Sequence, residues 1–170
     1  MSGASPWLQW RVGKWVANHR STPDDDGRVY DPYNDGPATP LFRFGSGLSY
    51  TTFDMRNLVV SSPTGSSPLF TVSVDLENTG GVSGAEVVQV YIIDPVMEYV
   101  RPWKRLLAFQ RVELAPGAKT TVKIPVSAAQ MSFQDDSSPA GNWTVVSGEY
   151  QIRVGNCSQY DLLTQTVHVP

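Results

Sequence analysis

The sequence predicts an all-β protein, an antiparallel β-sandwich of about seven short strands. From about Arg56 onward, apolar and polar residues alternate over short segments that are separated by turn-forming residues. No segment keeps an apolar stripe at the 3.6-residue period of a helix, and Ser127–Phe133 is long enough for one helical turn only. Short alternating strands with regular turn signals are typical of immunoglobulin-like and fibronectin III-like sandwiches.

The expected strands follow one another along the C-terminal part of the chain. They are Asn57–Ser61, Leu69–Glu77, Ala85–Asp94, Leu106–Leu114, Lys119–Val126, Glu149–Val154 and Leu163–Val169. Turns are expected at residues 78–81 and 115–117, where Gly, Pro and Asn gather. The third strand is the richest in β-branched residues, which indicates a central position in its sheet.

Period-two alternation also predicts which side chains face the core. In the second strand, Thr71, Ser73 and Asp75 are expected on the opposite face. Tyr150 follows a glycine at the start of a late strand, as in a tyrosine corner. The predicted core-facing residues are Val72, Val74, Leu76, Val122, Ile124, Val126, Tyr150, Ile152 and Val154.

Residues 1–50 differ from the rest and are expected to form an irregular extension ahead of the sandwich at 51–170. The stretch Ser21–Pro40 is dense in Pro, Gly and Asp, which break helices and interrupt sheet ladders. It is expected to be an extended connector. Three tryptophans precede it, at Trp7, Trp10 and Trp15.

Composition and charge exclude several classes of function. Hydrophobic residues make up 41% of the sequence and charged residues 17%, as in a globular protein rather than a disordered one. The net charge of −3 gives no reason to expect a nucleic-acid partner, because phosphate recognition needs clustered Lys and Arg. No apolar run reaches the roughly 18 residues of a membrane span, so no membrane partner is expected.

The sequence offers no set of metal or cofactor ligands. Cys157 is the only cysteine, which rules out an intrachain disulfide and a thiolate metal cage. His19 and His168 lie far apart in sequence, so no zinc site is expected. A catalytic pair of Cys157 and His168 would need an orienting group and a cleft. We therefore expect no cofactor, and Cys157 is expected to be a half-exposed structural cysteine near a strand end.

Candidate catalytic residues are few. The adjacent carboxylates at 24–26 and 135–136 lie among turn residues, where aspartate caps turns or stays solvated. Glycoside hydrolysis needs two carboxylates facing each other across a sugar, which neighbouring residues of one loop do not provide. Gly45-Ser46-Gly47 and Gly81–Gly84 lack the spacing of a serine hydrolase elbow, and the first is expected to be a tight turn. The sequence predicts no catalytic residue.

Ordered motifs along the chain resemble a known family. Residues 40–53, PLFRFGSGLSYTTF, resemble the PLFPFGYGLSYTTF junction of family 3 β-glucosidases and β-xylosidases, which leads into a C-terminal fibronectin III-like domain. Arg43 and Ser46 replace the usual Pro and Tyr, so packing against a catalytic partner is expected to be altered. Val12-Gly13 and Asn18-His19 resemble a remnant of the preceding α/β sandwich domain. The resemblance continues through Glu77–Gly80, Gly84–Tyr91, Asp94-Pro95, Arg101–Leu106, Phe109–Gly117, Gly148–Tyr150 and Val154-Gly155.

The resemblance implies a non-catalytic accessory domain. The family hydrolyses terminal β-linked sugars with retention, using an aspartate in an N-terminal barrel and a glutamate usually in the following sandwich domain. Neither domain is in this sequence, so no catalytic residue is carried over, and glucosidase and xylosidase parentage both stay open. The expected role is to pack against the catalytic domains or against a second copy of the chain.

Localisation is predicted only for the parent protein. Residues 1–7 lack the charged start and apolar stretch of a signal peptide, so either the chain stays inside the cell or it is the tail of a longer protein. The parent is expected to be extracellular or secretory. Two sequons, beginning at Asn142 and Asn156, are candidate N-glycosylation sites and favour this interpretation.

The aromatic residues support two hypotheses about partners. Tryptophan is more often core or interface material than a sugar platform, because it buries a large area and keeps one N–H donor. The alternative is a free-standing carbohydrate-binding or adhesion module that binds polysaccharide, for which Trp143 is a further platform. A hydrolase in its own right is the third hypothesis, and turnover of an aryl β-glucoside would support it. The residues predicted for interdomain contact are Trp7, Trp10, Trp15, Phe42, Phe44 and Trp103.

Overall fold

Strands make up nearly all the regular structure. The computed structural model describes residues 42–61, 69–93, 104–135, 142–158 and 163–169. The described residues from Arg43 onward belong to one compact unit. The elements in chain order are β1 (Phe53–Val60), β2 (Phe70–Asn78), β3 (Gly84–Ile93), β4 (Lys104–Leu114), β5 (Lys119–Val126), α2 (Ala128–Met131), β6 (Phe133–Asp135), β7 (Asn142–Thr144), β8 (Gly148–Gly155) and β9 (Leu163–Val169).

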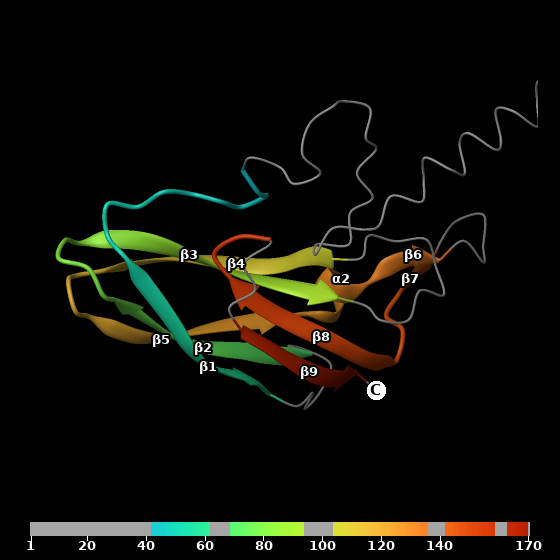
Figure 1. Cartoon of the computed structure of the whole chain (residues 1–170). Coiled ribbons are helices and arrows are strands. Elements are labelled where there is room, and N and C mark those ends of the chain that lie inside the picture. Colours follow the sequence, from blue (N-terminus) through green and yellow to red (C-terminus); the bar gives the residue numbers. More distant parts are fainter. Residues whose placement is uncertain (1–41, 62–68, 94–103, 136–141, 159–162, 170) are drawn as a thin grey trace, which may run out of the picture. The chain divides into compact units, whose positions relative to one another are not determined.

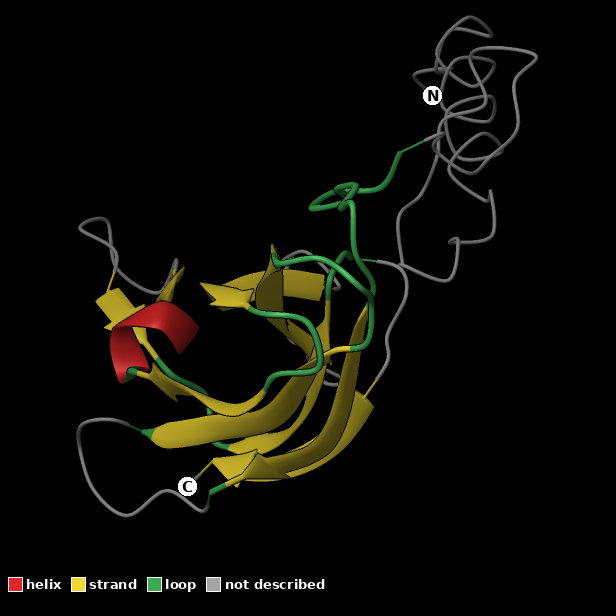
Figure 2. Ribbon diagram, turned by 90° about the vertical axis from the view of Figure 1, so that its left-hand side faces the viewer, coloured by secondary structure: helices red, strands yellow, loops and turns green. Residues whose placement is uncertain are grey.

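Seven of these strands form two facing antiparallel sheets (Figures 1 and 2). One sheet has the order β1-β2-β5 and the other β4-β3-β8-β9. The sheets meet along both sides, where β1 contacts β9 and β4 contacts β5. At the first of these seams the Val60 amide donates to Gln165 Oε1 at 2.9 Å. The predicted fibronectin III-like sandwich is confirmed.

The core lies between the sheets and follows the predicted alternation. In β2, buried residues alternate strictly with half-buried ones, and Val72, Val74 and Leu76 have no exposed surface. The core-facing residues predicted in β5 and β8 are buried as well. Each buried aliphatic side chain of this size contributes about 1.5–3 kcal/mol relative to an exposed one, so these strands account for much of the stability.

Strand β3 is buried on both faces over its second half. It lies between β4 and β8, as its β-branched composition predicted. Val88, Val90 and Ile92 belong to the core cluster. On the opposite face Gln89 and Tyr91 are 5% and 2% exposed. This second buried face carries polar side chains, and Gln89 on it is hydrogen-bonded to the backbone of Gly45, ahead of β1.

The predicted start of β1 at Asn57 is wrong, because the strand begins at Phe53. A bulge between Arg56 and Val59 shifts its register against β2, and Asn57 has a φ of 55°, which asparagine tolerates better than most residues. The bulge lets Met55 and Val60, five residues apart, both face the core. The bulge also interrupts the alternation of apolar and polar residues, so the first half of the strand could not be recognised from the sequence.

The chain between β5 and β8 combines a confirmed prediction and a missed element. The single helical turn predicted in Ser127–Phe133 is α2, Ala128–Met131. The two-stranded sheet of β6 and β7 was not predicted, since three-residue strands are too short to show an alternation of apolar and polar residues.

The predicted tyrosine corner is confirmed, because the Tyr150 hydroxyl donates to the Val146 carbonyl at 2.7 Å.

Shortening a core residue of β2 tests the predicted face assignment. We expect Leu76→Ala to lower the free energy of unfolding by about 2–5 kcal/mol, because it leaves a cavity between the sheets. Urea denaturation measures the change. Ser73→Ala, on the opposite face of the same strand, is the matched control and should stay within about 0.5 kcal/mol of the parent chain. Equal effects of the two substitutions would contradict the assignment.

Candidate functional site

Residues 43–50, called the junction below, lead irregularly into β1 (cyan in Figure 1). They begin with a tight turn in which the Ser46 amide donates to the Arg43 carbonyl at 2.9 Å. Gly45 has a φ of 78°, a backbone conformation that L side chains rarely adopt. The tight turn predicted at Gly45-Ser46-Gly47 is therefore confirmed around Gly45.

Gln89 of β3 anchors the junction to the outer face of its sheet. Its Nε2 donates to the Gly45 carbonyl at 3.0 Å and to the Asn156 carbonyl at 2.7 Å. Its Oε1 accepts a hydrogen bond from the Tyr91 hydroxyl. A Cβ atom on Gly45 would lie 2.1 Å from Gln89 Oε1, so any larger residue there would have to displace the Gln89 amide in addition to adopting the unfavourable φ. The junction backbone thus lies directly on a buried amide.

A second set of bonds holds the junction to the chain that follows β8. The Ser158 amide donates to the Phe44 carbonyl at 2.9 Å. The Lys104 ammonium donates to the Ser158 carbonyl and lies 5.8 Å from the centre of the Tyr91 ring. A cation over an aromatic face is favourable, the more so where water is excluded. The start of the junction is therefore held by residues that are far from it in sequence, Gln89 of β3 and Ser158 after β8.

Asn78 fixes the other end of this region, where the junction passes into β1. Its side chain has no exposed surface and uses all its hydrogen-bonding capacity. Nδ2 donates to the Val82 and Leu114 carbonyls at 2.8 and 3.0 Å. Oδ1 accepts from Thr51 Oγ1 at 2.7 Å and from the Gly80 amide at 3.0 Å. The motif Glu77–Gly80 thus joins three turns around one buried amide.

The anchored junction presents large apolar side chains to solvent. Phe44 is 55% exposed, and Leu48 and Tyr50 are fully exposed. We call these three residues the junction surface. On the sheet beside it, Phe109 lies opposite Gln89 in register and is 66% exposed. Exposed apolar side chains gathered on a rigid segment are typical of an interaction site.

The structure describes two of the six residues predicted for interdomain contact. Phe42 and Phe44 are exposed, and the four tryptophans Trp7, Trp10, Trp15 and Trp103 lie outside the described residues. Sequence reasoning missed two members of the junction surface, Leu48 and Tyr50. Both residues belong to the motif GLSYTTF, which indicates the family but does not indicate that these two side chains are exposed.

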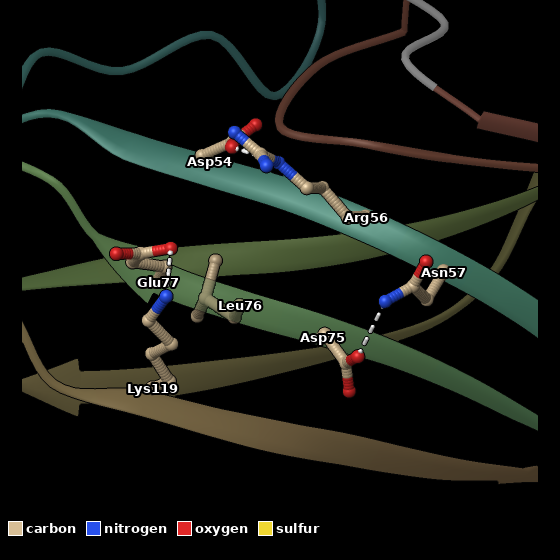
Figure 3. A pocket seen from close by; sticks show the side chains of 7 residues that line it. All are labelled: Asp54, Arg56, Asn57, Asp75, Leu76, Glu77 and Lys119. Carbon is tan, nitrogen blue, oxygen red and sulfur yellow. Dashed lines mark hydrogen bonds and ion pairs between the residues drawn. The ribbon is translucent and has the colours of Figure 1, made fainter.

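A polar hollow lies on the outer face of the β1-β2-β5 sheet (Figure 3). Its carboxylates are all engaged by neighbouring groups: Asp54 pairs with Arg56, and Glu77 with Lys119 at 2.9 Å. Asp75 accepts from Asn57 Nδ2 at 2.9 Å and from Thr121 Oγ1 at 2.6 Å. These hydrogen bonds, that from Thr121 first, lower the pKa of Asp75 below its ordinary value of 3.8. The hollow is lined by Asp54, Arg56, Asn57, Asp75, Leu76, Glu77 and Lys119.

Of the catalytic candidates, the structure describes the side chains of Cys157 and His168 only. The acidic run at 24–26, Asp136 and the side chain of Asp135 lie outside the described residues. Cys157 is 3% exposed, so the expectation of a half-exposed cysteine is wrong: the chain turns inward after β8. His168 lies on an exposed position of β9, whereas Cys157 is buried. Among the residues that the structure describes, no three His, Cys, Asp or Glu side chains gather as metal ligands would.

The two sequons differ in their surroundings. Asn156 is half-buried, and Cys157 and Ser158 after it are buried. Asn142 begins β7, and the following Trp143 is 72% exposed. Glycosylation at either asparagine stays a prediction.

Within the described part of the chain, no helix has the length and apolar character of a membrane span.

Comparison with known proteins supports the fibronectin III-like fold that the two sheets form. A family model, the fibronectin type III-like domain, matches residues 86–158. A probable β-glucosidase D of Aspergillus niger is 36% identical over 151 residues, covering 79% of this chain and 19% of the relative. The chain carries the fibronectin type III-like domain of family 3 glycoside hydrolases. A periplasmic β-glucosidase of Salmonella typhimurium is 36% identical over 143 residues, covering 75% of this chain and 19% of the relative.

Solved structures of β-glucosidases contain the same fibronectin type III-like domain. A β-D-glucoside glucohydrolase from Trichoderma reesei superposes with a TM-score of 0.69 at 34% identity, over 78% of this chain and 20% of that one. A β-glucosidase from Listeria innocua gives 0.72 at 29% identity, over 88% and 20%. The chain thus spans about a fifth of the length of these relatives.

Removing the buried amide tests the anchoring of the junction. We expect Gln89→Leu to lower the free energy of unfolding by about 2 kcal/mol or more, since it removes three hydrogen bonds at a buried position. Hydrogen exchange of the Ser158 amide should accelerate, because the junction is released. Gln110→Leu, at an exposed position of β4, is the control and should change neither quantity. Unchanged exchange in Gln89→Leu would contradict the anchoring role.

The Asp75 hydrogen bonds predict a pH dependence of stability. Because the pKa is lower in the folded state, the stabilisation is complete above 3.8 and is lost as the pH falls through that value and below it. We expect Asp75→Asn and Thr121→Val both to flatten the fall in urea midpoint on acidification. Thr166→Val, an exposed change on β9, should leave the slope unaltered. A slope that stays the same in Asp75→Asn would refute this interpretation.

Proposed function

We propose that this chain is the non-catalytic accessory domain of a family 3 β-glycosidase and packs through the junction surface against the catalytic domains of that enzyme. The observation that carries the proposal is the exposure of Phe44, Leu48 and Tyr50 on a junction whose start is hydrogen-bonded to Gln89 and Ser158. Burying three such side chains against a partner would contribute several kcal/mol, at about 1.5–3 kcal/mol each.

The comparisons support the same role and refine the parent activity. The chain corresponds to about a fifth of proteins named as β-glucosidases, so the remaining four fifths of a parent would hold the chemistry. We therefore propose a β-glucosidase rather than a β-xylosidase as the parent. The periplasmic relative supports an extracytoplasmic parent. Specificity would reside in the catalytic domains, and this domain would stabilise their fold.

A domain replacement tests the packing role. The fibronectin type III-like domain of the Salmonella typhimurium enzyme is replaced by residues 43–170 of this chain, and hydrolysis of an aryl β-glucoside is followed after heating. We expect activity with a thermal midpoint close to that of the intact enzyme. The triple change of Phe44, Leu48 and Tyr50 to Ser should lower the midpoint by about 5 °C or more, since it removes apolar contact area.

The control and the contrary outcomes separate the hypotheses. Val59→Ser changes an exposed apolar residue of β1, outside the junction surface, and should leave the midpoint unchanged. A midpoint unaffected by the triple change would refute packing through this surface. Light scattering of the 170-residue chain should show a monomer, whereas a dimer dispersed by the triple change would assign the surface to self-association. Turnover of the aryl β-glucoside by the chain alone would refute the non-catalytic role.

A further inference from the structure

A further exposed aromatic residue, Trp143, belongs to the chain between β5 and β8. Trp143 of β7 is 72% exposed and borders a hollow of about 460 Å³. We call it the Trp143 hollow. It is lined by Ala128, Ala129, Ser132, Trp143 and Val145. Among the residues that the structure describes, this lining contains the aromatic ring of Trp143, the small side chains of three residues of α2 and its C-terminal end, and no charged side chain.

Helix α2, which supplies two residues of the lining, is hydrogen-bonded to strand β4. Met131, the last residue of α2, is 3% exposed and packs into the core. Gln130 Nε2 donates to the Leu107 carbonyl at 3.1 Å, and an Arg105 guanidinium nitrogen donates to the Met131 carbonyl at 2.8 Å. One side of α2 is therefore fixed by long side chains. Its other residues, Ala128 and Ala129, line the hollow with short side chains.

We propose that the Trp143 hollow binds one neutral glucosyl ring of a β-glucan, stacked on the indole. A pyranose has a flat face of C–H bonds and a rim of hydroxyl groups. Its apolar face fits an exposed indole, and its hydroxyl groups would stay in water or bond to Ser132. The inference rests on the proposed function, since a β-glucosidase parent would bring β-linked glucose chains near this domain.

Size and charge favour a sugar over a protein partner. The hollow is shallow and open to solvent, and its volume of about 460 Å³ leaves room for one sugar ring on the indole with the other face of the sugar in water. A stable protein contact needs about 800 Å² from each partner, far more than five mostly small residues offer. The described lining residues are uncharged and provide no counter-charge for an anionic ligand. The occupant therefore has the size and neutrality of one sugar unit.

The position leaves both surfaces free to act together. The junction lies beside Gly155, at the end of β8, because Gln89 pairs with that residue. Val145 lies three residues before Gly148, which begins the same strand. Eight strand residues span roughly 25 Å, so a sugar chain on Trp143 would not displace a domain packed on the junction surface. The hollow would thus hold a non-reacting part of a substrate chain.

Affinity electrophoresis of the 170-residue chain tests the proposal. The native gels contain laminarin, a soluble β-glucan, at increasing concentration. We expect the chain to be retarded, and Trp143→Ala to weaken the apparent affinity at least tenfold. Ala129→Leu, at an exposed helix position, should fill the hollow and have a similar effect while keeping the indole. The retardation should persist at high salt, because no charge is involved.

Phe109→Ala is the matched control, since it removes another exposed aromatic residue from the same domain. It should leave the retardation unchanged. The proposal is overturned if the parent chain migrates freely, if Trp143→Ala is retarded normally, or if Phe109→Ala loses as much affinity as Trp143→Ala. These outcomes are independent of the domain replacement: a stabilising graft without laminarin binding would refute the sugar site alone, and laminarin binding without stabilisation would refute the packing role alone.

Discussion

The placement of the junction depends on one buried side chain, the amide of Gln89. Only 5% of it is exposed, and it bonds at once to the junction backbone, to the chain after β8 and to a neighbouring hydroxyl. An unpaired polar group in such a place costs about 1–3 kcal/mol, so the three partners are held together. Because the junction backbone is committed to Gln89, its large apolar side chains are left facing solvent. The exposure of Phe44, Leu48 and Tyr50 is thus a consequence of how the backbone is anchored.

The sandwich and its surfaces have different physical origins. The sheets are stabilised by regular burial of aliphatic side chains, which tolerates many sequences of the right pattern. The surfaces arise where the regular pattern ends: at the turn containing Gly45, after β8, and in the short chain between β5 and β8. Interaction sites commonly lie on segments held by a rigid scaffold, and the two proposed surfaces lie outside the seven strands of the sandwich.

The sequence predicted the strands well because each buries one face. The strict alternation in β2 leaves a single orientation possible, and the same holds for β5 and β8. The prediction failed at β1, where the bulge beside Asn57 interrupts the period, and at β6 and β7, which are too short to have one. It also failed at Cys157, because burial outside a strand leaves no periodic signal.

By itself the sequence determined the fold class, the core-facing residues and the family, since alternation and ordered motifs are local properties of the chain. Only the tertiary structure decided which residues meet at the surfaces. Gln89, Gly45 and Ser158 are brought together by the pairing of β3 with β8 and by the path of the junction. Trp143 of β7 lines one hollow with the two alanines of α2. Such contacts join residues far apart in sequence, and no local pattern specifies them.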